Sequence, residues 1–410
     1  MGGLTAAVFL ASQGGVSTVL VERHSGSALH PRAIGYTTRT MELFRSVGDR
    51  ATTKHAGWPP PRRARVESLT GSWFEEYPPW SPTEFSASNA SDHSPAHASA
   101  IAQDALEPIL RHRAVELGAD LRLGTELVSF QDDEGGVTVT LRRRADGSEY
   151  HVKADYLIAA DGGAKSSVRD ALRIGRTGRG QLSVRRSILF SAPELEQHLR
   201  HGIVQFEIEQ DGFDAFLTTY SDGRWVLMLN DDRDRSEDEQ CDAIRRATGM
   251  DDLVIDLITT GGRWELSALI ADHFSCGRVF LVGDAAHQLP PNRGGYGANT
   301  GIGDAHNLAW KIAAVLEGRS EARLLDTYDA ERRPVAWLRH NQIFAHDDYK
   351  AYGDASAPAE EIIDDVAMEL GQLYRSAALP RCRPGAARSP DTRRVTGNPA
   401  RGRARVDRPA

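Results

Sequence analysis

Residues 279–314 read VFLVGDAAHQLPPNRGGYGANTGIGDAHNLAWKIAA. The first four residues are apolar, which predicts a buried strand that delivers Gly283 and Asp284 at its carboxyl end. A glycine-rich run at 294–297 then leads into a helix that begins near Asn299. Because open α/β sheets bind ligands at the carboxyl ends of their strands, this order predicts an α/β fold with a ligand beside Asp284.

The chemistry of this segment suits the pyrimidine end of a flavin. Asp284 can accept a hydrogen bond from a ribityl hydroxyl, and the glycines at 294–297 permit close approach of the backbone. The helix start near Asn299 presents amide groups to an anion or an electron-rich ring edge, and a reduced flavin carries negative charge there. The alternative is a tight structural loop, which the ordered succession of strand, acid, prolines, glycines and helix disfavours.

The N-terminal segment contains half of a dinucleotide-binding pattern. Gly3 opens a predicted helix over Leu4–Gln13, and a buried strand over Val16–Glu22 ends in an acid nineteen residues after that glycine. Gly3 matches the last glycine of such a fingerprint and Glu22 matches its ribose-binding acid. The first two glycines would fall upstream of Met1, so we expect the true start to lie upstream or FAD binding to be weak. An ordinary βα unit with a surface Glu is the alternative.

The composition disfavours several functional classes. The 410 residues include 49 basic and 57 acidic ones, a net charge of −8, so we expect no nucleic-acid partner. Cys241, Cys276 and Cys382 form neither a disulfide framework nor a zinc pattern, which favours a reducing, cytoplasmic setting. No apolar run approaches the roughly 18 residues of a membrane span. Neither an HExxH pattern nor a Ser-His-Asp set is evident, so no metal site and no catalytic side chain are predicted, and the oligomeric state stays open.

Helix and strand patterns predict an α/β, Rossmann-like cofactor domain that is interrupted by a largely antiparallel sheet. The more specific assignment, an FAD-binding domain of the glutathione-reductase type, is what the resemblance to a known family implies. Alternating segments between Ser183 and Leu229 supply that sheet, which we expect to face the substrate. The expected divisions are a first FAD-binding part at 1–182, which includes substrate-domain residues at about 58–100, the substrate sheet at 183–270, a second FAD-binding part at 271–350, a C-terminal helix at 351–376 and a disordered tail at 377–410.

The sequence resembles the class A FAD-dependent aromatic hydroxylases, the para-hydroxybenzoate hydroxylase fold group, and is most similar to the phenol and polyketide hydroxylases. The likeness covers residues 1 to about 376, and we expect the thioredoxin-like domain that follows in larger members to be absent. Several motifs in family order carry it: VLVERH at 19–24, HPRAIGYTTRTMELFRSVG at 30–48, IAQDALEPIL at 101–110, YLIAADGGAKSSVR at 156–169, GRVFLVGDAAHQLPP at 277–291 and LLDTYDAERRPVA at 324–336.

The resemblance implies which residues contact the cofactor. Those implied for the adenosine and pyrophosphate end are Gly3, Glu22, Arg23, Arg32 and the backbone of Val128. Those implied for the ribityl chain, the ring and the nicotinamide coenzyme are Gln103, Asp161, Gly162, Ser167, Gly283, Asp284, Pro291, Gly297, Ala298 and Asn299. Simpler interpretations stay open for three positions: a solvated charge at Arg32, a helix start at Gln103, and a strand-to-helix turn at Asp161-Gly162.

The activity that the resemblance implies is that of an FAD-dependent monooxygenase. In such enzymes NADPH or NADH reduces FAD, dioxygen adds to give a flavin 4a-hydroperoxide, and one oxygen atom passes to a phenolic or polycyclic aromatic substrate of the polyketide type. The cofactor supplies this chemistry, while the protein orients the substrate and excludes water. The alternatives are a Baeyer–Villiger or epoxidising monooxygenase, and a non-catalytic remnant that serves as a binding or scaffold protein.

Overall fold

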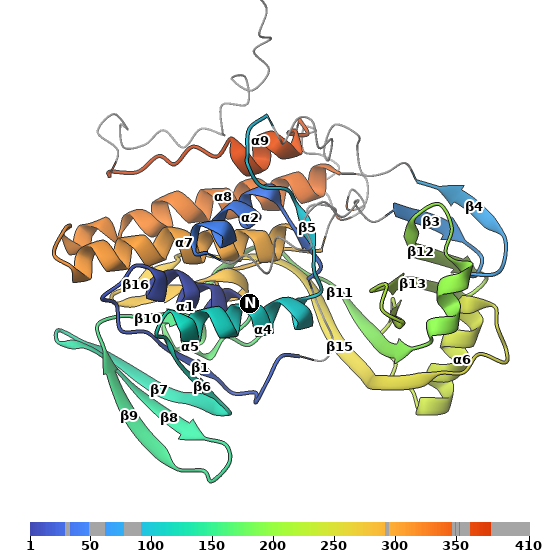
Figure 1. Ribbon diagram of the computed structural model, residues 1–410, viewed down its shortest axis with the longest axis horizontal. Coiled ribbons are helices and arrows are strands. Elements are labelled where there is room, and N and C mark those ends of the chain that lie inside the picture. Colours follow the sequence, from blue (N-terminus) through green and yellow to red (C-terminus); the bar gives the residue numbers. More distant parts are fainter. Residues whose placement is uncertain are drawn as a thin grey trace, which may run out of the picture.

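Figure 1 shows the computed structural model of the chain, whose described residues are 1–28, 33–48, 62–77, 92–291, 295–346, 349, 352 and 361–378. Helices gather around short strands on the left of the view, and a large sheet lies on the right. We call these regions the helical part and the sheet part. The main helices of the helical part are α1 (Gly2–Ser12), α2 (Thr38–Ser46), α4 (Gln103–Glu116), α7 (Tyr296–Leu316) and α8 (Thr327–Ala345).

Parallel strands form two short groups in the helical part. Strand β1 (Val19–Glu22) pairs with β6 (Asp120–Leu123), and β10 (Leu157–Ala159) pairs with β17 (Val279–Leu281), whose other neighbour is the antiparallel β16 (Ser275–Cys276). The start of α1 contacts both groups. A Cβ at Gly3 would lie 3.4 Å from Ala160 Cβ and 3.5 Å from Leu20 Cδ1. The first turn of α1 therefore lies against β1 and against the residue that follows β10.

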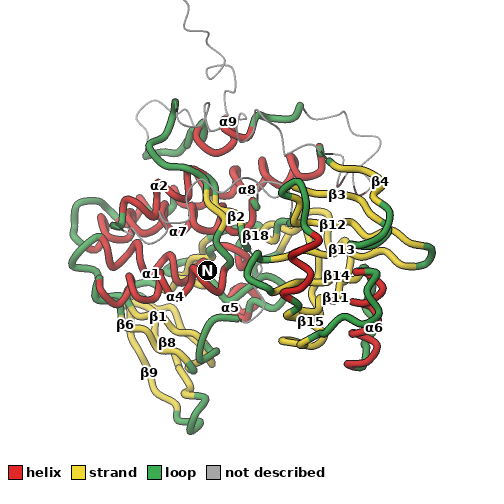
Figure 2. The backbone as a smooth tube through the Cα atoms, turned by 45° about the vertical axis from the view of Figure 1, so that its right-hand side comes forward, coloured by secondary structure: helices red, strands yellow, loops and turns green. Residues whose placement is uncertain are grey.

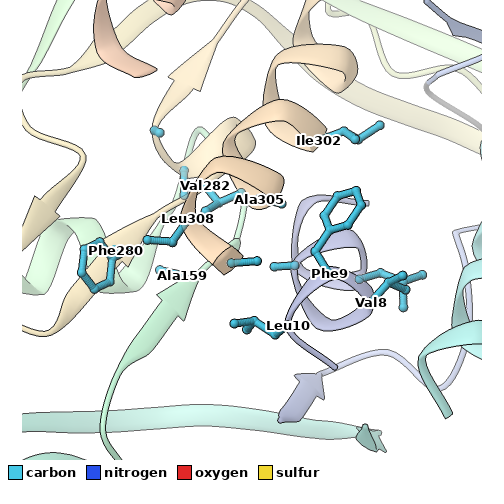
Figure 3. Packing of buried hydrophobic residues seen from close by; sticks show 14 of the residues in the cluster. Val8, Phe9, Leu10, Ala159, Phe280, Val282, Ile302, Ala305 and Leu308 are labelled. Atoms are coloured by element: carbon cyan, nitrogen blue, oxygen red, sulfur yellow. The ribbon is translucent and has the colours of Figure 1, made fainter. Parts of the chain in front are cut away.

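Helix α1 is buried on all sides, because its sequence is small or apolar around its whole circumference. Every residue from Leu4 to Ala11 is buried. Phe9 packs edge-on against the ring of His306 at 5.3 Å, and a buried side chain of this size contributes about 1.5–3 kcal/mol. Figure 3 labels the residues that pack here from α1, the parallel strands and α7: Val8, Phe9, Leu10, Ala159, Phe280, Val282, Ile302, Ala305 and Leu308.

The sheet part has eight strands in the order β18-β15-β11-β14-β13-β12-β3-β4. All neighbours are antiparallel except β12 and β3. Figure 2 shows its strands side by side. Their bounds are β3 (Arg62–Val66), β4 (Trp73–Glu76), β11 (Arg176–Ser191), β12 (Ile203–Gln210), β13 (Phe213–Thr219), β14 (Arg224–Leu229), β15 (Asp256–Ala271) and β18 (His287–Gln288). The prediction of a largely antiparallel sheet is confirmed.

One face of this sheet packs against helix α6 (Glu237–Thr248), which begins with a capping box between Ser236 and Glu239. Trp225 and Phe206 stack at 6.5 Å at the centre of this core, and Ile244 of α6 joins them. Burial of these large rings makes the sheet part a second hydrophobic core, separate from the one around α1.

A three-stranded meander, β7 (Thr125–Asp133), β8 (Gly136–Arg143) and β9 (Glu149–Ala154), projects at the lower left of Figure 1. The remaining short elements are β2 (Gly35–Tyr36), β5 (Ser99–Ala100), α5 (Ser167–Ala171), the 3-10 turns η2 (Pro193–His198), η3 (Gly283–Ala285) and η4 (Ala322–Leu324), and α9 (Asp365–Leu370). No helix within the described ranges is both long and apolar enough to cross a bilayer.

Several predicted boundaries were wrong. The residue pattern at 121–130, LRLGTELVSF, predicts one strand, but the structure divides it between β6 (Asp120–Leu123) and β7, because Gly124 has a φ of +65° that regular strand geometry does not contain. Helix α7 begins at Tyr296, one turn before the expected start near Asn299. The helix expected over 351–376 is reduced, within the described residues, to α9. Apart from 377 and 378, the expected tail lies outside the described residues.

Candidate functional site

Three glycines bring the ends of three elements together. A Cβ at Gly301 of α7 would lie 2.9 Å from the Cα of Gly283, and a Cβ at Gly283 would lie 4.0 Å from the Cα of Gly2 in α1. Gly283 also has a φ of +62°, which favours glycine. We call Gly2, Gly283 and Gly301 the glycine junction. Larger residues would push the two helices and the turn after β17 apart, so the junction fixes how closely these backbones approach.

Asp284 is the exposed residue of an otherwise buried turn. Gly283, Ala285, Ala286 and His287 are all buried, whereas Asp284 is exposed. Its carboxylate therefore lies at the carboxyl edge of β17, beside the glycine junction, where it can accept hydrogen bonds from a ligand. The position matches the prediction for a ribityl-binding acid, and its contact with FAD stays a prediction.

A fully buried carboxylate, Asp304 of α7, holds the turn that carries Asp284. One oxygen of Asp304 accepts from His287 Nε2 at 2.7 Å and from the backbone amide of Gly283 at 3.4 Å. The other oxygen accepts from Arg332 Nε at 2.7 Å. Burial would raise the pKa of Asp304, but the charges of Arg332 and His287 outweigh it and lower the pKa, so the carboxylate is ionised. Asp304 thus clamps both ends of the turn.

The first turn of α7 has backbone amides directed at its N-terminus. Its N-cap is Gly295, with a φ of +58° and no side-chain cap, so the turn is suited to an electron-rich ligand. Gly297 and Ala298 lie in this turn, and a Cβ at Gly297 would be 3.7 Å from the Leu289 carbonyl oxygen. The exposed Pro291 precedes them, and its carbonyl accepts from the Tyr349 hydroxyl.

The side chain of Asn299 serves the protein scaffold. Its Oδ1 accepts from the Thr37 amide at 3.0 Å and the Thr40 hydroxyl at 2.6 Å, while its Nδ2 donates to the carbonyls of Gly35 at 3.2 Å and Gly295 at 2.9 Å. These contacts tie β2 and α2 to the start of α7. A contact from Asn299 to the cofactor ring stays a prediction.

Gln103 lies close to the start of α1. Its Nε2 donates to Glu107 at 2.8 Å, and Glu107 lies 3.3 Å from the Met1 amino group. Its backbone amide donates to the Ala33 carbonyl at 2.9 Å, so it also begins α4, as the simpler interpretation held. Gln103 is thus brought to the same end of α1 as the glycine junction.

The predicted adenosine residues lie where β1 ends. The Glu22 carboxylate accepts from the His24 amide at 2.9 Å, and the next residue, Arg23, is exposed. Val128 is 41% exposed at a bulge in β7. Arg32 lies outside the described residues.

Asp161 and Gly162 form the turn between β10 and α5. The carboxylate of Asp161 accepts from the hydroxyls of Ser166 at 2.6 Å and Ser167 at 3.2 Å, and from the Val168 amide at 3.1 Å. Gly162 has a φ of +94°. The strand-to-helix turn is therefore present, and the Asp161 carboxylate caps the start of α5. A role of Asp161 toward FAD or the nicotinamide coenzyme stays a prediction.

A comparison with known protein families shows to which family the chain belongs. Residues 1–342 match the family described as FAD binding domain. The chain belongs to this family. The flavoprotein is a flavin-dependent oxidoreductase, and the glycine junction, the exposed Asp284 and the uncapped start of α7 fit FAD. The resemblance to FAD-dependent hydroxylases is thereby confirmed.

Relatives of the flavoprotein include named monooxygenases. It is 40% identical over 403 residues to 4-methyl-5-nitrocatechol 5-monooxygenase of Burkholderia sp, which covers 92% of this chain and 71% of the relative. It is 41% identical over 353 residues to a putative polyketide hydroxylase of Streptomyces halstedii, which covers 82% of this chain and 61% of that protein. The chain therefore spans only part of each relative.

Solved structures give the same result for the fold. The ternary complex of aklavinone-11 hydroxylase with FAD and aklavinone superposes with a TM-score of 0.79 at 32% identity, covering 92% of this chain and 72% of that one. The flavin-dependent monooxygenase PieE in complex with FAD and substrate superposes with a TM-score of 0.75 at 30% identity, covering 84% and 61%.

Sequence reasoning missed residues that join the two parts of the flavoprotein. Arg224, at the start of β14, donates to Asp104 of α4 at 2.6 Å and also pairs with Asp222 at 2.6 Å. Asp104 directly follows Gln103, so this link lies beside the predicted cofactor contact. In the sequence, the only indication of a role for Asp104 is its position next to Gln103 in the segment at 101–110. Among the described residues, no group of three or more His, Cys, Asp or Glu is arranged to hold a metal ion.

Proposed function

We propose that this flavoprotein is a monooxygenase that hydroxylates a phenolic or polycyclic aromatic substrate of the polyketide type, with NADPH or NADH and dioxygen as co-substrates. The observation that carries the proposal is the glycine junction with the exposed Asp284 beside it, in a chain whose relatives are named for hydroxylation of aromatic and polyketide compounds. Bound FAD would supply hydride acceptance and oxygen activation.

The residues of the chain would bind and orient that cofactor. Asp284 would accept ribityl hydroxyls, and the first turn of α7, with Gly297 and Ala298, would receive the pyrimidine end. Glu22 would hold the adenosine ribose at the end of β1, and Gln103 would lie beside the ribityl chain. The contacts of Gly2 with Val282 and Ala160, and of Gly3 with Ala160 and Leu20, support this arrangement, because they bring β1, β10 and β17 to the start of α1.

The substrate would lie between the sheet part and the start of α7. The Arg224–Asp104 ion pair joins the β13–β14 turn to α4 next to Gln103, so this end of the sheet faces the cofactor region. Exclusion of water there protects the activated oxygen species from wasteful breakdown. The similar ternary complex, that of aklavinone-11 hydroxylase with FAD and aklavinone, supports a hydroxylase that holds its substrate and FAD together.

Reconstitution with FAD tests the proposal directly. The purified chain, incubated with FAD and desalted, should retain a yellow flavin that NADPH or NADH bleaches without air. With a polycyclic phenol and ¹⁸O₂, mass spectrometry should find one labelled oxygen atom in the product and the other in water. A protein that retains FAD and consumes NADPH but never labels an aromatic product would contradict hydroxylation, and a protein that stays colourless would contradict flavin binding.

A further inference from the structure

Helix α9 packs against the part of the molecule that contains the start of α7. In Figure 1 it lies at the top of the helical part, next to α2 and α8. We call residues 361–378, which contain α9, the α9 segment. Six residues are too few for a helix to be stable in water alone, so α9 depends on its docking contacts. No residue of this segment is among the predicted cofactor contacts.

The carboxylate of Glu369 joins α9 to two other helices. One oxygen accepts from the hydroxyl of Thr37, the N-cap of α2, at 2.9 Å. The other oxygen accepts from Arg339 Nη2 of α8 at 2.7 Å. The side chains of Arg339 and Glu369 are 3% and 9% exposed, so solvent screens this ion pair only weakly. Removal of the Glu369 charge would leave the Arg339 guanidinium buried without its partner.

Both partners of Glu369 also bind the start of α7. The Thr37 amide donates to Asn299 Oδ1 at 3.0 Å. Arg339 Nη1 donates to Thr300 Oγ1 at 2.8 Å. Glu369 therefore acts through one intermediate residue on each of two consecutive side chains of α7. Because the first turn of α7 is the proposed binding site for the pyrimidine end of FAD, displacement of Glu369 should move the backbone amides of that turn.

Tyr296, the first residue of α7, makes a second contact with the α9 segment. Tyr296 is 2% exposed, and its hydroxyl donates to Asp365 Oδ1 at 3.0 Å. Burial raises the pKa of this hydroxyl and the charge of Asp365 raises it further, so the phenol stays protonated and remains the donor. Asp365 and Glu369 lie one turn apart in α9. They therefore hold the first turn of α7 at two points.

The far end of the α9 segment is attached to a different part of α7. Ser376 Oγ donates to Glu331 Oε1 at 2.7 Å. The other oxygen of Glu331 accepts from Lys311 Nζ at 2.7 Å and from Asn307 Nδ2 at 2.8 Å, and both of these residues belong to the second half of α7. Ser376 is buried, as Glu369 is, so its replacement loosens the same segment away from the first turn.

We infer that Glu369 is a positioning residue of the cofactor site, and that docking of the α9 segment and binding of FAD strengthen each other. This inference rests on the proposed function, which places FAD at the first turn of α7. Glu369 acts through Thr37 and Arg339, which fix the backbone that receives the cofactor. Because such coupling is reciprocal, FAD should stabilise the docked segment by the factor by which docking raises the affinity for FAD.

Substitution of Glu369 in the full chain tests its role. Glu369→Gln keeps the size of the side chain, but it cannot accept from both Thr37 and Arg339, because the amide nitrogen only donates. The dissociation constant for FAD, measured by titration of flavin fluorescence, should rise at least about tenfold, as expected for one charge-assisted contact. The visible circular dichroism of the bound flavin, which reports how the ring is held, should change as well.

Ser376→Ala is the matched control, because it loosens the same segment at its far end. Both variants should lower the melting temperature of the FAD-free protein. Only Glu369→Gln should raise the dissociation constant for FAD or change the visible circular dichroism. An equal rise in both variants would show that weaker FAD binding follows from general loosening of the segment, and it would overturn the role of Glu369. An unchanged dissociation constant in Glu369→Gln would overturn it too.

Hydrogen exchange on the unaltered protein tests the coupling without any substitution. The amides of Ala367, Met368 and Gly371 donate to acceptors within the docked α9 segment, so their exchange reports its undocking. Saturating FAD should slow this exchange by at least about tenfold, the factor expected for the change in affinity. The slowing should be lost in Glu369→Gln and retained in Ser376→Ala.

The outcomes separate this inference from the proposed function. FAD that slows exchange at residues 295–301 but not in the α9 segment would overturn the coupling and leave the proposed placement of FAD intact. FAD that binds without slowing exchange at 295–301 would overturn both the placement and the inference. None of these measurements requires turnover. A protein that shows the coupling but labels no aromatic product would therefore support the inference, while the proposed hydroxylation fails.

Discussion

Arg224 of β14 and Asp104 of α4 lie 2.6 Å apart and join the sheet part to the helical part, although 120 residues separate them in sequence. Both side chains are about three-quarters buried, so the pair is only partly screened by solvent. The link adjoins Gln103, so it joins the two parts beside a predicted cofactor contact.

Replacing Asp104 with Asn should weaken that link without disturbing the Arg224–Asp222 pair. We expect a loss of about 1–3 kcal/mol in the interaction between the two parts and a lower ratio of product formed to NADPH oxidised, because a looser seam admits water. Coupling is measured by comparing product with coenzyme consumed. Asp222→Asn is the matched control, and equal uncoupling in both variants would contradict a specific role for Asp104.

Asp304→Asn should destabilise the protein and weaken FAD binding together. The substitution leaves Arg332 buried without its carboxylate, which costs about 3–5 kcal/mol, and frees the turn that carries Asp284. The melting temperature and the dissociation constant for FAD are the measurements. Glu317→Gln, which removes an exposed ion pair at the end of the same helix, should change stability by less than about 0.5 kcal/mol. An unchanged FAD affinity in Asp304→Asn would show that the contacts of Asp304 do not position the turn for FAD.

Asp284→Asn should affect the cofactor and spare the fold. Because Asp284 is exposed, its replacement should change the free energy of unfolding by less than about 0.5 kcal/mol. The dissociation constant for FAD should rise about tenfold, the value for one lost charge-assisted hydrogen bond. Asp252→Asn, at an exposed position in the sheet part, is the control. Equal FAD affinity in the two variants would falsify the assigned role.

Stability should fall in mild acid because of His306. Burial, with a smaller effect of Arg39 and Arg332, lowers the pKa of His306 to about 4. The unfolded chain, with an ordinary value near 6.5, therefore takes up the proton first as the pH falls. The stability that depends on neutral His306 is fully present above pH 6.5. As the pH falls from 6.5 to about 4, the free energy of unfolding decreases by about 3 kcal/mol. Between pH 7 and 4, the melting temperature should decline less steeply in His306→Gln than in the unaltered protein. Parallel curves of melting temperature against pH would contradict this role of His306.

Local chemistry made part of the site predictable from sequence. A strand followed by glycine and an acid predicted the turn at Gly283 and Asp284, because strand ends and glycine conformations depend on neighbouring residues. The break at Gly124 between β6 and β7 was not predicted, since a single glycine within a strand-like pattern does not by itself indicate a left-handed conformation. The Asp304 clamp and the Arg224–Asp104 pair depend on folding partners far along the chain, which periodicity does not encode.

The two longest strands, β11 and β15, leave the helical part as neighbours: Arg176 is the register partner of Ala271. Each has 16 residues and would span roughly 50 Å if fully extended. Since the exit and the return of the chain are adjacent there, residues 177–270 form a cassette that could be exchanged between relatives by cutting at two neighbouring points. Exchange at these two points would replace most of the sheet part while leaving the helical part intact.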